Sequence, residues 1–295
     1  MRVYIWNLTR GGNNRPDDEW RIQVTGIGQF EEELDAKTLI LGWQHEKGVF
    51  VGFDFGRHRN PLGSSPSIQI REEALDRAAL RGFAPHRRGN EELAVAFLPG
   101  LLAQYVENLE ALHGCGQESN EFEILEQIAD SVGRLEEGEI TRAVDEPRSS
   151  SVVSLNRWVR AHDFSRRVLR AYGDKCAMCD VQLRLLDGAH VLPVGHCQST
   201  DQTENGVALC ATHHRAYDRA LVGFDRNYRI GVNSRKVAQL KAEGLADGFE
   251  RFRSSLRPSL HLPCDESDRP SKQLTVLANQ VRGWCAADWH YVRRG

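Results

Sequence analysis

The chain has 295 residues, of which 40% are apolar and 27% charged, with a formal net charge of −3. This length and apolar content suffice for two compact domains and exclude a single small module. No apolar run reaches the roughly 18 to 20 residues needed to span a bilayer, and the N-terminus turns polar too early for a secretory signal. We therefore expect a cytoplasmic protein with no membrane partner.

The first part of the chain is rich in short β-branched and aromatic segments. Strands are predicted at residues 2–8, 20–26, 37–43 and 48–55, separated by Gly, Asn, Pro and Asp. A helix at 71–82, a buried strand at 92–99 and a helix at 100–114 follow. These elements predict an α+β, β-rich domain with a curved or barrel-like sheet.

The sign of the charge changes near the middle of the chain. Between Glu118 and Glu146 there are ten acidic residues against two basic ones, in a segment (118–144) that resembles an acidic amphipathic helix. Beyond a stretch with Pro147 and three serines, a basic helix is predicted at 157–175. We place one domain at 1–145, a linker at 146–156 and a second domain at 157–295. The acidic helix can be a solvated face or a surface that contacts a partner.

The cysteines indicate metal binding. Their number, seven, is odd in a chain with no export signal, which argues against a disulfide framework. Cys176 and Cys179 form a CxxC pair, and Cys210 and His213 form a CxxH pair after thirty intervening residues. Two such pairs can hold one tetrahedral ion, so we expect a structural Zn²⁺ in a zinc knuckle. Cys115, Cys197, Cys264 and Cys285 lack partners at ligand spacing and are expected as free thiols.

Three further residues accompany the metal pairs: His190 in "AHVLP", Asn205 in "NGVAL", and His214 directly after His213. Together with the zinc pairs, this order resembles the HNH endonucleases, whose motif is built on a ββα-metal unit. The resemblance covers roughly residues 160 to 233, about a quarter of the chain. It implies a metal-dependent DNA endonuclease that hydrolyses phosphodiester bonds.

The resemblance implies a role for each of these three residues. His190 follows an apolar segment and is expected near a strand end, where a neutral imidazole can take a proton from the attacking water. Asn205 would brace the loop that carries this base. His214 lies about 100° around the helix from His213, so one histidine can face the zinc and the other the scissile phosphate. His214 would then hold the catalytic cation.

The second ligand of the catalytic cation is left open by the sequence. Many members of the family carry an aspartate directly before the histidine base, where this chain has Ala189. Asp218 lies four residues after His214 on the same helical face, although it can equally pair with a neighbouring arginine. Other candidates come from the strand and the following loop: Asp187, His196, Asp201 and Glu204. The ion itself can be Mg²⁺, Mn²⁺, Ni²⁺ or Co²⁺.

The remaining partners are predicted from domain order and charge. Contacts with DNA phosphates are expected from five arginines of the basic helix: Arg157, Arg160, Arg166, Arg167 and Arg170. Residues 1–145 would recognise double-stranded DNA, an architecture similar to that of bacterial modification-dependent restriction endonucleases. Two alternatives are a conventional restriction enzyme on unmodified DNA and a zinc-stabilised DNA-binding module without catalysis. A homodimer is expected if both strands are cut.

Overall fold

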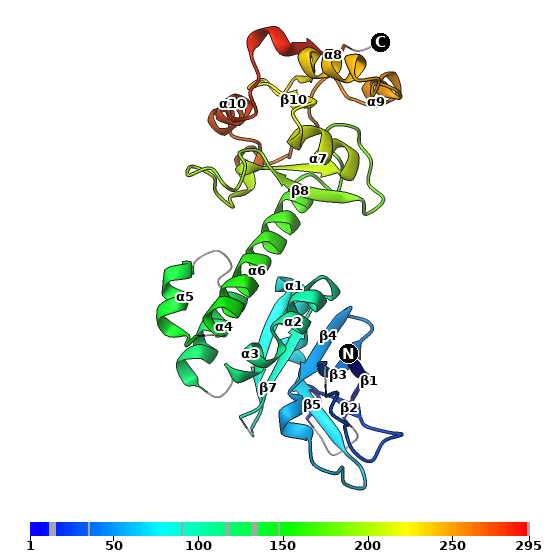
Figure 1. The fold of residues 1–295 in the computed structure, drawn as a ribbon, viewed down its shortest axis with the longest axis vertical. Helices are drawn as coiled ribbons and strands as arrows, with labels where there is room; N and C mark the ends of the chain where they lie inside the picture. The colour runs from blue at the N-terminus through cyan, green and yellow to red at the C-terminus, as the bar shows by residue number, and fades with distance from the viewer. Residues whose placement is uncertain are drawn as a thin grey trace. The chain divides into compact units, whose positions relative to one another are not determined.

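The computed structural model of the chain describes residues 1–11, 16–34, 36–89, 91–115, 118–130, 135–146 and 148–293. It contains two compact units, Met1–Asp163 and Phe164–Gly295 (Figure 1). Each unit combines strands with helices, which confirms the predicted α+β class. None of the helices within the described ranges is long and apolar enough to cross a membrane.

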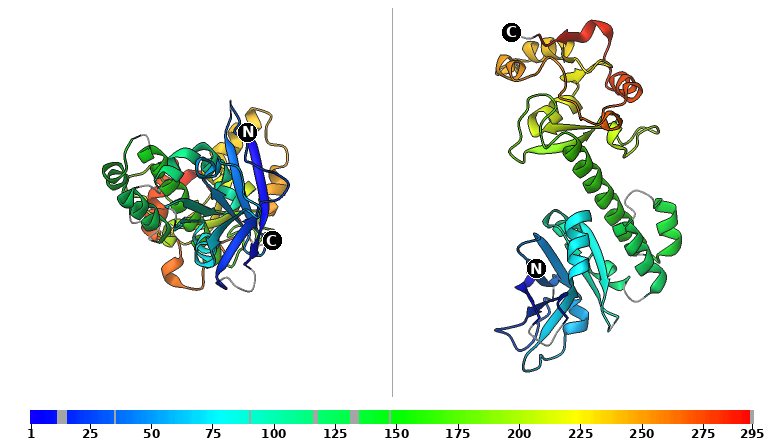
Figure 2. Two further views of the ribbon diagram at one scale, coloured as in Figure 1. Left: turned by 90° about the horizontal axis from the view of Figure 1, so that it is seen from below. Right: turned by 180° about the vertical axis from the view of Figure 1, so that it is seen from behind.

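A mixed seven-stranded sheet forms the centre of the first unit (Figure 2). The strands lie in the order β5-β2-β1-β3-β4-β7-β6, with β1 and β3 parallel and the other neighbours antiparallel. Their bounds are β1 Arg2–Arg10, β2 Glu19–Gln23, β3 Thr38–Gln44, β4 Val49–Phe53, β5 Ser67–Arg71, β6 Phe83–Arg87 and β7 Leu93–Phe97. The four strands predicted first, and the later one near 92–99, are thereby found.

Both faces of this sheet are buried at β3, β4 and β7, because alternate side chains of these strands point to two separate cores. Leu39 and Leu41 of β3 pack with the helices that follow the sheet, whereas Ile40 packs in the other core. That other core also receives Leu75 of α1 (Glu72–Arg81). Small residues of β7, such as Ala94, lie on this side and leave room for the helix.

The two ends of the sheet come close to each other. β5 and β6 are its outermost strands, they are joined by α1, and Arg88 Nη2 donates a hydrogen bond of 2.9 Å to Gln69 Oε1 across the interval. The sheet is therefore strongly curved and nearly closed, as predicted for a barrel-like domain. Part of the basic segment at 81–90 belongs to this sheet, since residues 83–87 form β6.

Five helices follow or continue the sheet. They are α2 Leu102–Glu107, α3 Leu109–Gly114, α4 Ser119–Asp130, α5 Glu137–Ala143 and α6 Arg148–Ala171. The acidic segment predicted as one helix thus contains α4 and α5, and its residues 131–134 lie outside the described residues. Its Glu121 is buried and pairs with Arg148 Nη2 at 2.8 Å, so the acidic charge is not wholly solvated.

Most of the segment expected as a linker, 146–156, is helical, because residues from Arg148 onwards belong to helix α6. Val152, Leu155 and Val159 recur at helical spacing and are buried in the first unit. The three serines lie in the first turn, where serine is well tolerated. Pro147 lies outside the described residues. The division into domains at 145 and 157 stays a prediction, whereas the compact units meet at Asp163 and Phe164, within α6.

The second unit contains an antiparallel strand pair followed at once by a helix. These are β8 Leu186–His190, β9 Gly206–Cys210 and α7 Ala211–Asp218. The last part of α6 packs closely on the pair, since a Cβ atom on Gly206 would lie 2.2 Å from Val168 Cγ2. The remaining elements are β10 Val222–Phe224, β11 Ile230–Asn233, α8 Ser234–Ala242, α9 Phe249–Ser254, α10 Lys272–Val281 and β12 Trp289–Tyr291.

Candidate metal centre and catalytic site

The four predicted metal ligands lie together in the second unit. Cys176 and Cys179 come from a tight turn closed by a hydrogen bond from Asp180 N to Cys176 O, whereas Cys210 and His213 come from the start of α7. Their ligand atoms all lie within 4.8 Å of one another. Across the described part of the chain, this is the one group of three or more His, Cys, Asp or Glu side chains that could hold an ion.

Distances within the group match a tetrahedral centre. His213 Nδ1 lies 3.2 Å from Cys210 Sγ and 3.6 Å from Cys176 Sγ, and Cys179 Sγ lies 3.9 Å from Cys210 Sγ. Bonds of about 2.3 Å to sulfur and 2.0 Å to nitrogen place tetrahedral ligands roughly 3.5 to 3.8 Å apart. The predicted spacing of the two pairs therefore produces a metal-binding cluster.

The chemistry of the cluster also favours a cation. Burial raises the pKa of the Cys179 thiol to about 12 and raises that of Cys176, because a thiolate is poorly solvated there. Burial lowers the pKa of His213, which keeps its imidazole neutral and able to coordinate. The buried thiols of Cys176 and Cys179 become stable thiolates only beside a compensating positive charge.

His190 ends strand β8, as its position in the sequence predicts. Its ring stacks on Phe164 at a centroid distance of 3.8 Å, and its Nε2 lies 3.1 Å from Asp201 Oδ1. A carboxylate accepts hydrogen bonds only, so in the neutral imidazole this contact places the proton on Nε2. Nδ1 then carries the lone pair that can accept a proton.

Asn205 is fully buried between the strand end and the following loop. Its Oδ1 accepts a hydrogen bond from Leu192 N at 2.8 Å, and its Nδ2 donates to Thr200 O at 2.8 Å and to Ser199 Oγ at 3.1 Å. Asn205 thus ties the segment just after His190 to the segment just before Asp201. This is the geometry expected of a residue that braces the loop of the base.

His214 lies on α7 with a carboxylate at each ring nitrogen. Nδ1 is 3.0 Å from Asp187 Oδ2, and Nε2 is 3.4 Å from Asp218 Oδ2. Asp187 comes from β8, so the ββα arrangement brings together two of the candidate ligands that the sequence left open. Each ring nitrogen thus has one carboxylate beside it. An ion at Nδ1 would have His214 and Asp187 as ligands, and an ion at Nε2 would have His214 and Asp218.

Arg282 is part of the same region, although nothing in the sequence singled it out. Its Nη1 donates to Val191 O at 2.6 Å, and its guanidinium lies 4.1 Å from the centre of the Tyr217 ring. Its Nη2 is 3.9 Å from Asp218 Oδ1. A lone arginine after α10, 92 residues beyond His190, offers no local pattern by which it could be recognised.

The five arginines expected to contact DNA have different environments. Arg157 forms an ion pair with Glu137, with Nε 2.6 Å from Oε1. Arg167 donates to Asp201 O at 2.7 Å and to Thr203 Oγ1 at 3.0 Å, and so supports the loop beside His190. Arg160 and Arg166 are partly buried and have interactions within the protein, whereas Arg170 is exposed. Contacts of these arginines with phosphate stay a prediction.

The second unit combines a two-stranded ribbon, a following helix and a Cys3His metal cluster, with His190 on the ribbon and His214 on the helix. This combination defines a ββα-metal nuclease site. In agreement, residues 176–225 match the HNH endonuclease family. The second unit therefore carries a region similar to the HNH endonucleases, and this match together with the metal-binding cluster indicates a metal-using, DNA-hydrolysing enzyme.

Other comparisons concern the first unit and the whole chain. Residues 1–106 match a family described as methylase-associated X1. A solved structure described as a modification dependent TagI restriction endonuclease is 11% identical, with a TM-score of 0.31 over 95% of this chain and 81% of that chain, which is a distant likeness. A search of the curated proteins found no match to the sequence.

Proposed function

We propose that the protein is a modification-dependent DNA endonuclease in which His190 is the general base. The observation that carries the catalytic part is the hydrogen bond between His190 Nε2 and Asp201 Oδ1. It orients the imidazole and leaves Nδ1 to take the proton from the attacking water. Asp201 acts through His190 and is therefore a positioning residue.

Two metal sites belong to this proposal. Cys176, Cys179, Cys210 and His213 would hold a structural Zn²⁺, because four ligands of this kind leave no vacant position for a substrate. His214 would hold the catalytic cation, which is Mg²⁺, Mn²⁺, Ni²⁺ or Co²⁺, and either Asp187 or Asp218 would add the second ligand. A divalent cation there would polarise the scissile phosphate and stabilise the leaving 3′ oxygen. Comparing the metal dependence of Asp187→Asn and Asp218→Asn separates the two carboxylates.

Substrate selection would come from the first unit. An HNH region grips mainly the DNA backbone, so selective cleavage needs a further contact with DNA. The curved sheet of the first unit, with Arg71 at the end of β5 and Arg88 directly after β6, supports this assignment. A dimer would supply the second active site needed to cut both strands, and sedimentation of the protein with and without DNA tests it.

A second candidate is a restriction enzyme that cuts unmodified DNA beside a protecting methylase. The family matched by residues 1–106 is described as methylase-associated, which favours this alternative. The deciding experiment is cleavage of matched unmodified, methylated, hydroxymethylated and phosphorothioated DNAs with each metal, with His190→Ala as control. Cutting of one modified DNA supports the first proposal, and a fixed pattern on unmodified DNA supports the second. If His190→Ala cuts as well as the wild type, the mechanism is wrong.

A further inference from the structure

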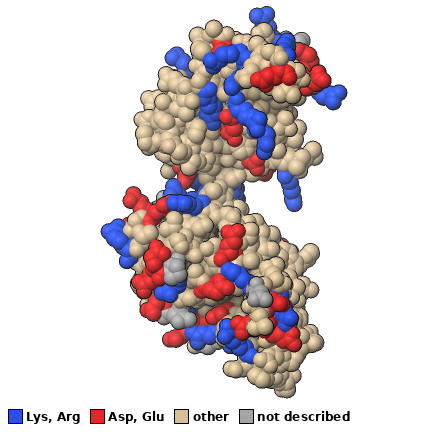
Figure 3. Space-filling model, viewed as in Figure 1, with Lys and Arg blue, Asp and Glu red and all other residues tan. Residues whose placement is uncertain are grey.

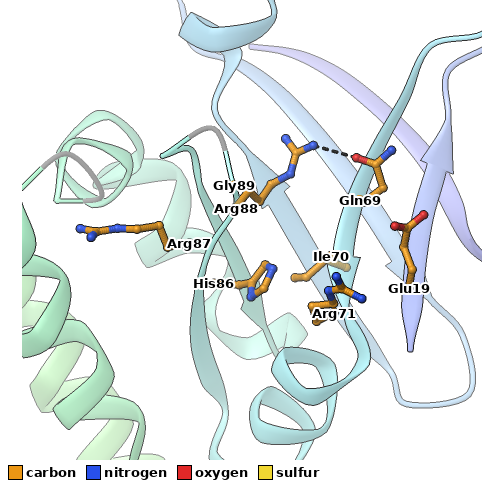
Figure 4. Close-up of a pocket in the computed structure, with 8 residues that line it drawn as sticks. All are labelled: Glu19, Gln69, Ile70, Arg71, His86, Arg87, Arg88 and Gly89. Atoms are coloured by element: carbon orange, nitrogen blue, oxygen red, sulfur yellow. Dashed lines mark hydrogen bonds between the residues drawn. The ribbon is translucent and has the colours of Figure 1, made fainter. Parts of the chain in front are cut away.

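A cavity of about 450 Å³ lies in the seam where the two ends of the first sheet approach each other (Figure 4). β5 contributes Gln69 and Arg71, and β6 with its following turn contributes His86 and Arg88. We call this cavity the seam pocket. β5 and β6 each have one strand neighbour among the described strands. The backbone N–H and C=O groups on their other edges are therefore not paired with a further strand.

Two arginines give the seam pocket its charge. Arg71 forms an ion pair with Asp18, with Nη1 2.7 Å from Oδ1, and both side chains are about half exposed. Such an exposed pair contributes little and is easily exchanged for another anion. Arg88 is held by the buried Glu92 and by Gln69, which fixes its guanidinium at the mouth of the pocket.

Not every basic residue beside the pocket contributes to it. Arg87 also borders the pocket, but its side chain points away, toward α4, where its guanidinium lies 4.4 Å from the centre of the Phe122 ring (Figure 4). The one acidic lining residue, Glu19, is half-buried on β2. The pocket therefore offers two arginines, each paired with a carboxylate beside it, Asp18 and Glu92, whereas Glu19 is the one carboxylate among its lining residues.

The pKa of His86 depends on the positive charges around the pocket. Its ring lies between β6 and β5 (Figure 4), on the same side of the strand as the buried Ala84. Burial lowers the pKa of His86, and the charges of Arg71 and Arg88 lower it further, against a smaller opposing effect of Glu73. The imidazole is thus neutral at pH 7, and it can donate or accept a hydrogen bond without offsetting the arginines.

We propose that the seam pocket binds a phosphate of the DNA backbone, with Arg71 and Arg88 as its charged donors and Gln69 as a polar neighbour. The inference rests on the proposed function, since it names the contact through which the first unit would hold DNA. A guanidinium suits phosphate because it can donate two parallel hydrogen bonds. The phosphate would replace Asp18 as the partner of Arg71, whereas Arg88 would stay paired with the buried Glu92.

The test measures binding of the full-length protein to two unrelated duplexes of about 20 base pairs, without added catalytic metal, at several salt concentrations between about 50 and 200 mM. Arg71→Gln removes one charged donor. Gln69→Glu adds a negative charge to the pocket but keeps the acceptor for Arg88. Asn7→Asp makes the same change of charge at an exposed position of β1 and serves as the matched control. Thermal unfolding shows that each variant folds.

Arg71→Gln should weaken binding equally for both duplexes and reduce the slope of log K against log salt by about 0.9, as expected for one lost phosphate contact. Gln69→Glu should weaken binding at least as much, and Asn7→Asp should resemble the wild type. Wild-type binding in both pocket variants would overturn the proposal but leave the DNA endonuclease intact. A change confined to one duplex would indicate base recognition and overturn it as well.

Two further outcomes separate this inference from neighbouring ones. If inorganic phosphate raises the unfolding temperature of the wild type but not of Gln69→Glu, while DNA binding is the same in both, the pocket is a site for a free anion and the proposal is wrong. If the wild type binds neither duplex, the pocket and the recognition role of the first unit both fail. Cleavage by the HNH region is then judged separately with the four DNAs.

Discussion

Replacing Asn205 by alanine should destabilise the second unit more than most single substitutions would. Three short hydrogen bonds of its side chain, to Leu192 N, Thr200 O and Ser199 Oγ, would be lost. At about 1 kcal/mol for each bond, plus about 1 kcal/mol for leaving the buried Leu192 N–H unpaired, the free energy of unfolding should fall by about 3 to 4 kcal/mol. For a unit of this size the unfolding temperature should fall by about 10 °C or more.

Two measurements on purified protein check this expectation: thermal unfolding followed by circular dichroism, and DNA cleavage at a temperature where both proteins are folded. Asn279→Ala is the matched control, since Asn279 in the same unit donates one side-chain hydrogen bond, to Phe224 O at 3.0 Å. It should lose about 1 kcal/mol and keep its activity. An Asn205→Ala protein that unfolds within about 3 °C of the wild type, or cuts DNA equally well, would refute the reasoning.

Three further predictions concern the same unit. Without metal, the chain should lose stability as the pH rises above about 8.5, because the thiols ionise in the unfolded chain while burial raises the pKa of Cys179 to about 12 in the folded chain. Zinc should abolish this loss. Unfolding measured at pH 7 and 10, with and without zinc, checks both expectations. Asp201→Asn should lower kcat by between about 10-fold and 10⁴-fold and alter the pH profile of cleavage, with DNA affinity unchanged; an unaltered profile would contradict its positioning role. Arg282→Ala should reduce the free energy of unfolding by about 1 to 3 kcal/mol and reduce cleavage, because Val191 O loses a charged donor; equal melting curves would count against this.

The sequence predicted the elements whose side-chain patterns are local. The early strands have the period of two and the aromatic content of a sheet, and the CxxC and CxxH pairs carry their own spacing. β5 and β6 were missed, since both are short and β6 contains a proline and two basic residues. The start of α6, residues 148–156, was assigned to a linker because three serines obscured the helical spacing of Val152 and Leu155, whereas the rest of the helix was predicted.

The residues of the candidate site could be named from the sequence more readily than the contacts between them. Asp201 could be named as one acidic residue among several, but its contact with His190 depends on a loop shaped by Asn205 and Arg167. Arg282 could not be named at all, since it reaches the site from the far end of the chain. Side chains that only the tertiary structure brings together have no characteristic spacing in the sequence, whereas metal ligands in a tight turn do.

The metal cluster and the candidate catalytic residues share their supporting elements. His213 binds from the first turn of α7, and His214, one residue later, faces Asp187 of β8. A ribbon of two strands has little stability of its own, and the cluster joins the end of β9 and the start of α7 to the turn of Cys176. Metal binding is therefore coupled to folding of the ribbon and helix. It follows that loss of the metal should remove cleavage by displacing His214 relative to His190, although the four cluster ligands are proposed only to hold the zinc.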